Sequence, residues 1–270
     1  MGGNVFKKDE NPLTQRIATK DVHPTIQFLE KITGLVFDEE DWLGTTGRKN
    51  HPDGSFEKNS SGDLDLNTDA NKVSKQDLIG KLSDWLQSQG VPEQDIMNVG
   101  RKKLDGYIAD KGDQVHFRTP IDGDPSKGYV QTDFMFTDNP DFQRGSKRGG
   151  TEQYSGKDRA ILISSIARAR GLKYSPKFGL QNAETNELIS NDWNEIAKLL
   201  LGNGATEKDT FTVESIIAAI KGDPDFDALV AKAREDFARD GKELPESVIT
   251  LADKNHNRIV ELINRLADSR

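Results

Sequence analysis

The chain has no cysteine and only four histidines, at positions 23, 51, 116 and 256. The absence of cysteine excludes disulfides, thiol nucleophiles, iron–sulfur clusters and every zinc site that uses a thiolate ligand. The histidines are scattered, with no pair at the spacing of metal ligands on a helix, so we interpret each as an ordinary surface or packing residue. A metal site in this protein would therefore have to rely on oxygen ligands.

Long apolar runs are absent too. No stretch approaches the roughly 18 apolar residues that cross a bilayer, and Met1–Lys8 lacks the apolar segment of a secretory signal. With 270 residues, of which 34% are hydrophobic, the chain is nevertheless long and apolar enough to form a folded core. We expect a globular cytoplasmic protein without membrane contact, and nothing in the sequence indicates its oligomeric state.

The charge of the chain is unevenly distributed. Its formal net charge of -8 argues against a protein that coats nucleic acid indiscriminately. Between residues 144 and 177, however, nine basic residues stand against only Glu152 and Asp158. The members of this basic window are Arg144, Lys147, Arg148, Lys157, Arg159, Arg168, Arg170, Lys173 and Lys177. The window predicts a site for a polyanion, either an RNA or the triphosphate of a nucleotide.

The hydrophobic pattern changes near residue 150. Before it, the spacing predicts a helix over 23–32 and another after Ser74, which is followed by Asp77 three residues later in the manner of a capping box. Alternating segments predict strands at about 62–67 and 129–136, with other short strands between them. Strand, helix and then several strands indicate a small mixed sheet backed by helices.

Beyond residue 150 the pattern becomes helical. Helices are expected over 160–170, from a cap at Ser190, over 213–220, over 224–241 and over 245–267. We predict an α+β protein in which residues 1–150 form a small mixed β-sheet domain with flanking helices and residues 151–270 form an all-helical region. The segment from Arg144 to Gly150 is the expected hinge.

Two aspartates separated by one leucine stand in Ser61-Gly62-Asp63-Leu64-Asp65-Leu66-Asn67. On a strand, Asp63 and Asp65 point to one face while the leucines point to the other. Side-by-side carboxylates repel each other, and a divalent cation would offset that cost. A third aspartate, Asp133, lies in the strand-like segment 129–136. Three carboxylates on neighbouring strands would form an oxygen-only site suited to Mg²⁺.

The aspartate segment has two alternative interpretations. A calcium loop of the D-x-D-x-N type fits the first five positions, but Thr68 stands where the loop needs glycine and Ser74 where it needs glutamate. The apolar Leu64 and Leu66 also favour a half-buried strand over a loop. A solvated acidic patch without any ligand is the second alternative.

The segment Gly44-Thr45-Thr46-Gly47-Arg48-Lys49 lies upstream of the aspartates. It does not have the spacing of a P-loop. Glycine followed by hydroxyl residues nevertheless lets a phosphate approach the backbone and offers side chains that can hydrogen-bond to it, although a plain turn is the simpler interpretation of the segment alone.

Together these segments resemble the DNA polymerase beta-like nucleotidyltransferase superfamily. Its pattern is an apolar residue with Gly and then Gly or Ser, followed by Asp-apolar-Asp/Glu-apolar on one strand and a third carboxylate on a later strand. The matching residues are Leu43-Gly44-Thr45, Asp63-Leu64-Asp65-Leu66 and Asp133. Thr45 replaces the usual Ser or Gly, and the gap from Gly44 to Asp63 is longer than the family usually has. Gly54-Ser55 is an alternative glycine element, although it stands rather close to Asp63.

A closer likeness is to uncharacterised nucleotidyltransferase-like proteins of bacteriophages. These carry a similar Leu-Gly-Ser/Thr-Thr-Gly-Lys start, Ser-Gly-Asp-Ile/Leu-Asp-Leu, and a Val-Gln-x-Asp-Phe-Met strand. A Lys-Tyr-x-Gly-like segment followed by arginine opens their helical half, and Tyr154-Ser155-Gly156-Lys157-Asp158-Arg159 is similar to it. The resemblance covers about residues 42–171 and implies the host cytoplasm as the location of a phage-encoded chain.

The resemblance implies Mg-dependent transfer of a nucleoside monophosphate from an NTP to an acceptor hydroxyl, with release of pyrophosphate. Two Mg²⁺ ions, or Mn²⁺ in their place, would be the cofactors in such a two-metal-ion site. Asp63 and Asp65 would bridge the two ions, and Asp133 would complete the ion beside the acceptor hydroxyl. The triphosphate would be held by Gly44, Thr45 and Thr46, with Arg48 or Lys49 nearby.

The helical half would supply further contacts to the nucleotide. Lys157 and Arg159 would reach the phosphates, and Tyr154 would stack on the base, although a solvated helix start and ordinary packing explain these residues as well. The acceptor stays open among an RNA 3′ end, a protein hydroxyl and a small molecule. The alternative function is a catalytically silent protein of the same fold that binds nucleotide or RNA or has a structural role.

Overall fold

The computed structural model describes residues 5–46, 59–98, 104–148, 150–151 and 154–243. The chain divides into two compact units, Met1–Gly149 and Gly150–Arg270. The division therefore falls where the hydrophobic pattern of the sequence changes. The expected hinge is in part helical, because α4 (Pro140–Ser146) extends into it.

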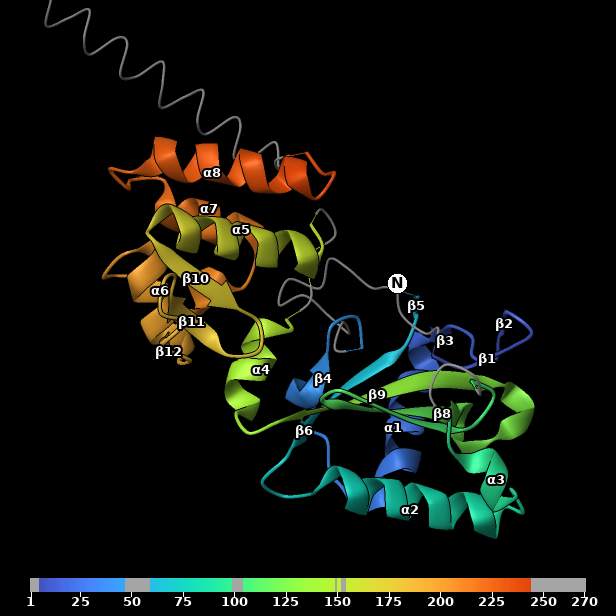
Figure 1. The fold of residues 1–270 in the computed structure, drawn as a ribbon. Coiled ribbons are helices and arrows are strands. Elements are labelled where there is room, and N and C mark those ends of the chain that lie inside the picture. The colour runs from blue at the N-terminus through green and yellow to red at the C-terminus, as the bar shows by residue number, and fades with distance from the viewer. Residues whose placement is uncertain (1–4, 47–58, 99–103, 149, 152–153, 244–270) are drawn as a thin grey trace, which may run out of the picture. The chain divides into compact units, whose positions relative to one another are not determined.

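A five-stranded sheet forms the centre of the first unit (Figure 1). Its strands lie in the order β4 (Trp42–Leu43), β6 (Leu64–Asp69), β9 (Tyr129–Thr137), β8 (Gln114–Pro120) and β7 (Ile108–Lys111). Strands β6 and β9 are parallel, and the other neighbouring pairs are antiparallel. The mixed sheet and both aspartate strands are thus confirmed, with β6 displaced by two residues from the expected range.

The sheet has one apolar face because side chains alternate along each strand. This face carries the buried residues Leu64, Leu66, Val115, Phe117, Phe134 and Phe136. Helices α1 (Thr19–Thr33) and α2 (Lys75–Ser88) lie against the sheet (Figure 1), and their buried side chains belong to the same core cluster as this face. Burying one such side chain contributes about 2 kcal/mol. A shift of one residue in β6 would expose its leucines, so packing fixes the register that turns Asp65 to the opposite face.

The ends of both helices have sequence signals. Gly34 adopts a left-handed φ of 68° after α1, and its N–H donates to the carbonyl of Glu30 at 2.8 Å. Ser74 caps α2, since its Oγ accepts a hydrogen bond from the backbone N–H of Asp77 at 3.1 Å. The predicted stop of α1 and start of α2 are therefore confirmed.

Short elements complete the first unit. Two antiparallel pairs are formed by β1 (Lys7–Lys8) with β2 (Asn11–Pro12) and by β3 (Ile17–Ala18) with β5 (Ser60–Ser61). The remaining elements are α3 (Glu93–Ile96) and the 3-10 turns η1 (Glu39–Asp41), η2 (Ile121–Gly123) and η3 (Pro125–Lys127). The pairing of β3 with β5 leads the chain directly into Gly62 and Asp63.

The second unit is not all-helical, so that prediction is wrong. Strands β10 (Leu172–Ser175), β11 (Gly179–Asn182) and β12 (Leu188–Ser190) form an antiparallel sheet in the order β10-β11-β12. Around it lie α5 (Gly156–Ala169), α6 (Trp193–Leu201), η4 (Glu207–Thr210), α7 (Val213–Ile220) and α8 (Phe226–Arg239). The whole described chain is therefore α+β. The last helix expected, over 245–267, lies outside the described residues.

One helix start in this unit also differs from its prediction. The cap of α6 is Asp192, whose side chain accepts from the N–H of Glu195 at 2.8 Å, and not Ser190. The Ser190 hydroxyl donates instead to the Glu195 carboxylate at 2.7 Å. Among the described residues, no helix combines the length and the apolar character needed to span a membrane.

Candidate metal centre

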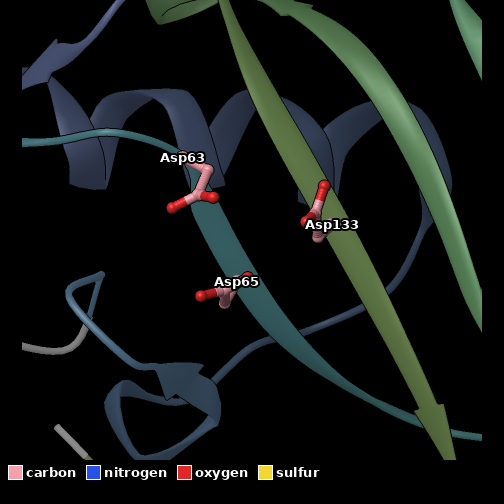
Figure 2. A group of neighbouring side chains, drawn as sticks. All are labelled: Asp63, Asp65 and Asp133. Carbon is pink, nitrogen blue, oxygen red and sulfur yellow. The ribbon is translucent and has the colours of Figure 1, made fainter. Parts of the chain in front are cut away.

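Asp63, Asp65 and Asp133 converge on one face of the five-stranded sheet (Figure 2). Each offers a carboxylate oxygen, and these oxygens all lie within 4.8 Å of one another. Asp65 and Asp133 are register partners on the parallel strands β6 and β9, and Asp63 immediately precedes β6. The convergence that the sequence pattern predicts is therefore present.

The three carboxylates are held close together against their mutual repulsion. Burial raises the pKa of Asp65 to about 8, with the charges of Asp63 and Asp133 adding to the effect and Lys147 opposing it. Burial also raises the pKa of Asp63, again with a contribution from Asp133, while Arg16 opposes the shift. A divalent cation between these oxygens would remove the repulsion, and carboxylate oxygens are the ligands that Mg²⁺ and Mn²⁺ prefer.

Gly44 lies directly beside Asp65. Its φ is 56°, and its N–H donates to the carbonyl of Lys147 at 3.0 Å. A Cβ atom at this position would stand 2.9 Å from Oδ2 of Asp65, closer than real contacts of that kind allow. Both the backbone conformation and the space therefore require glycine at residue 44.

The two threonines after Gly44 support the strand that carries the aspartates. Thr46 is 3% exposed, and its Oγ1 accepts a hydrogen bond from the backbone N–H of Asp65 at 2.8 Å. The hydroxyls of Thr45 and Ser61 lie 2.5 Å apart. Thr46 is thus engaged in fixing β6, whereas Arg48 and Lys49, the cations expected nearby, lie outside the described residues.

Three residues expected as nucleotide contacts, Tyr154, Lys157 and Arg159, belong to the second unit. Arg159 is 1% exposed, donates from Nε to the carbonyl of Thr210 at 2.5 Å, and lies 5.1 Å from the ring centroid of Trp193. Tyr154 is 9% exposed, and Lys157 pairs with Asp240 at 2.5 Å. Arg159 therefore contributes to the interior of its own unit, and the expectation that it reaches phosphates is not supported.

Much of the basic window is paired with acids. Its ion pairs join Arg144 to Asp41 and Asp141, Lys157 to Asp240, Arg168 to Asp236, and Arg170 to Asp223. Apart from Asp141, which is three residues from its arginine, these acids are far away in the sequence. A local count of charges therefore overstates the positive charge that this window offers to a polyanion.

Two residues of the centre escaped the sequence interpretation. His116, taken as ordinary packing, is 5% exposed, and its Nδ1 lies 2.7 Å from Oδ1 of Asp133. Gln131 donates from Nε2 to the same oxygen at 2.8 Å. Gln131 stands two residues before Asp133 on one strand, so the alternation could have placed both on one face. His116 gave no such signal, because its position depends on the pairing of β8 with β9.

Comparisons with known proteins give no match. No family model, no curated protein and no solved structure matches this chain. What the centre does must therefore be argued from its residues and its geometry.

Proposed function

We propose that this chain is a divalent-metal-dependent nucleotidyltransferase that moves a nucleoside monophosphate from an NTP to an acceptor hydroxyl. The observation that carries the proposal is the convergence of Asp63, Asp65 and Asp133, whose oxygens lie within 4.8 Å of one another. The order of the motifs supports it, because the glycine turn at Gly44 precedes the paired aspartates in the sequence and lies beside Asp65 in space. The resemblance to the DNA polymerase beta-like superfamily points to the same chemistry.

The donor set suits Mg²⁺ or Mn²⁺. Three carboxylates supply oxygen ligands only. Burial raises the pKa of Asp63 and of Asp65, and the neighbouring carboxylates add a repulsion that a bound cation would relieve. When bound, such ions lower the pKa of the acceptor hydroxyl and neutralise charge on the phosphates. Asp63, Asp65 and Asp133 would hold them.

The chain's own residues would orient the substrate. Gly44 has no side chain, so a phosphate can approach the backbone beside Asp65 without meeting a Cβ. Lys147, whose charge acts on Asp65, supplies a cation within the same unit. In the reaction, the acceptor oxygen loses its proton and bonds to the α-phosphorus as the bond to the β-phosphate oxygen breaks, and pyrophosphate leaves.

The direct test is label transfer by the full chain. Purified protein would be incubated with each α-labelled NTP, Mg²⁺ or Mn²⁺, and either total RNA, protein extract or small-molecule extract. The double variant Asp63→Ala/Asp65→Ala should lose transfer. Asp84→Asn, which changes an exposed carboxylate on α2, is the matched control and should retain it.

Each outcome decides between the two functions considered. Transfer that requires Asp63 and Asp65 supports the enzyme and identifies the acceptor by the fraction that takes up the label. Metal-dependent NTP binding without transfer to any fraction would instead support the catalytically silent alternative. If the protein shows no transfer and no metal-dependent NTP binding, the proposed function is overturned.

A further inference from the structure

One oxygen of the Asp133 carboxylate accepts hydrogen bonds from two side chains of the protein. Its Oδ1 lies 2.7 Å from Nδ1 of His116 and 2.8 Å from Nε2 of Gln131. An ionised carboxylate only accepts hydrogen bonds, so both nitrogens are donors. His116 and Gln131 are 5% and 3% exposed, which removes water as a competing partner. Among the residues that the structure describes, none forms a hydrogen bond to the second oxygen of Asp133, Oδ2, which can therefore face a ligand.

The sheet places His116 on the side of Asp133 away from β6, whereas Gln131 lies two residues before Asp133 on the same strand, β9. His116 on β8 is the direct register partner of Asp133, so the two side chains share a face. On the other side, Asp65 on β6 is its partner in the parallel pair. Asp133 therefore lies between β8, from which His116 donates a hydrogen bond to it, and β6, which adds the negative charge of Asp65.

Gln131 is oriented in its turn by the N-terminal segment. The backbone N–H of Val5 donates to Oε1 of Gln131 at 3.0 Å. Because a backbone N–H needs an acceptor, this contact assigns the amide oxygen to Val5 and the amide nitrogen to Asp133. The carboxylate is thus held by a chain of contacts that begins outside the sheet.

We infer that His116 and Gln131 are positioning residues that fix the Asp133 carboxylate so that its Oδ2 faces Asp63 and Asp65 and ligates the divalent cation. The inference rests on the proposed function, since it assigns these residues to the metal site proposed there. Residues that hydrogen-bond to a metal ligand orient it and strengthen metal binding, although they do not touch the ion. A histidine that only filled space would not need a donor aimed at this oxygen.

The test compares a variant that keeps the donor with one that keeps the ring. His116→Asn retains an amide N–H at about the place of Nδ1, and His116→Phe retains a ring without a donor. Mn²⁺ binding to the full chain would be measured by electron paramagnetic resonance, without nucleotide. His116→Phe should weaken binding about tenfold or more. His116→Asn should stay within about threefold of wild type, by the same dependence on the donor.

His23 provides a matched control, because it is an exposed histidine of the same unit whose ring lies 5.6 Å from that of Trp42. His23→Phe should leave Mn²⁺ binding unchanged. If His116→Phe does not fold, as judged by circular dichroism, Gln131→Met removes the second donor at similar volume and should weaken binding in the same direction.

The outcomes separate this inference from the proposed function. Failure of the wild-type chain to bind Mn²⁺ would overturn the metal site itself. If the wild type binds Mn²⁺ and a folded His116→Phe variant binds it equally well, the positioning role alone is overturned. Gln131→Met decides in the same way if His116→Phe does not fold. Equal weakening by His116→Asn and His116→Phe would also overturn it, because the donor would then not be the feature that matters.

Discussion

Asp65 in the first unit is half-buried and Asp236 in the second is buried, and the two carboxylates have opposite kinds of neighbour. Asp236, 2% exposed, accepts hydrogen bonds from Arg168 and Arg239, with nitrogen-to-oxygen distances of 2.7 to 2.9 Å. Burial raises the pKa of Asp236, but the hydrogen bonds from Arg168 and Ser165 outweigh it and the net shift is downward. Asp65 stands among carboxylates, and its pKa rises to about 8.

The difference separates an acid whose charge is compensated within the fold from one in a carboxylate cluster that could hold a metal ion. Asp236 finds its cations within its own unit, so its charge is compensated without any outside partner. Asp65 has two acidic neighbours and only the charge of Lys147 to oppose them. Ionising all three carboxylates therefore costs free energy that the contacts within the fold do not offset. Strongly shifted carboxylates of this second kind are typical of functional sites.

The largest expected effect is the loss of activity in Asp65→Asn. Removing one carboxylate from the cluster should lower nucleotidyl transfer by about 10³-fold or more, equivalent to several kcal/mol of transition-state stabilisation. Single-turnover transfer assays would measure it, with Asp84→Asn as the control. Retained activity in Asp65→Asn would erase the contrast between the two acids.

The converse change, Asp236→Asn, should affect stability and leave metal binding unchanged. Loss of the Asp236 charge should lower the free energy of unfolding by about 2 kcal/mol. The effect is smaller than for a fully buried ion pair because Arg168 and Arg239 reach solvent. Urea unfolding would check the loss of stability, and Mn²⁺ titration of the same sample would check that metal binding is unchanged. A stable Asp236→Asn variant with weakened Mn²⁺ binding would reverse the assigned roles.

The pH dependence of stability should distinguish the two acids in the absence of metal. The folded-state pKa of Asp65 is about 8, against an ordinary value near 3.8. Between these values the folded chain keeps a proton that the unfolded chain has released, so the free energy of unfolding falls as the pH rises through this interval. Asp65→Asn should therefore be more stable than wild type at pH 8, by up to about 5 kcal/mol, with the difference vanishing near pH 4.

Unfolding in EDTA at several pH values would measure this difference. Adding Mg²⁺ at pH 8 should stabilise the wild type and leave Asp65→Asn unaffected, because the metal binds to the ionised cluster. A difference between wild type and variant that grows toward low pH would contradict the direction of the shift.

The smallest predicted effect concerns the turn beside Asp65. Gly44→Ala and Gly112→Ala both place a side chain at a positive φ, of 56° and 61°, and each should cost about 1 kcal/mol. The added methyl group meets Oδ2 of Asp65 only at residue 44, since a Cβ at Gly112 has no atom within 4 Å. Isothermal titration should therefore find weaker Mn²⁺ binding in Gly44→Ala alone. Equal binding by both variants would show that the close approach is unimportant.

The sequence predicts the two aspartate strands of the first unit well, because β6 and β9 are six and nine residues long and alternate. Leu64 and Leu66 are buried as expected, and Asp65 and Asp133 point to the opposite face. In the second unit, β10 to β12 contain only three or four residues each, too few for alternation to stand out among helices. The all-helical prediction failed for this reason.

The candidate site divides in the same way. Its three aspartates and Gly44 were predicted from local spacing, whereas His116 depends on the register of two strands and could not be. The sequence near Arg159 suggests a phosphate contact and gives no sign of its burial. That burial involves Thr210 and Trp193, which lie far along the chain. The pairing of Arg170 with Asp223 was hidden from a local count of charges for the same reason.

The parallel pairing of β6 with β9 also sets the order in which the protein can assemble. Parallel neighbours cannot be joined by a tight turn, and here α2, β7 and β8 lie between them in the chain. Closing so long a loop is slow and must precede any gain from the contact. During synthesis, Asp63 and Asp65 therefore emerge well before Asp133. The complete carboxylate trio, with its capacity to retain a cation, arises only when the last strand of the sheet has docked.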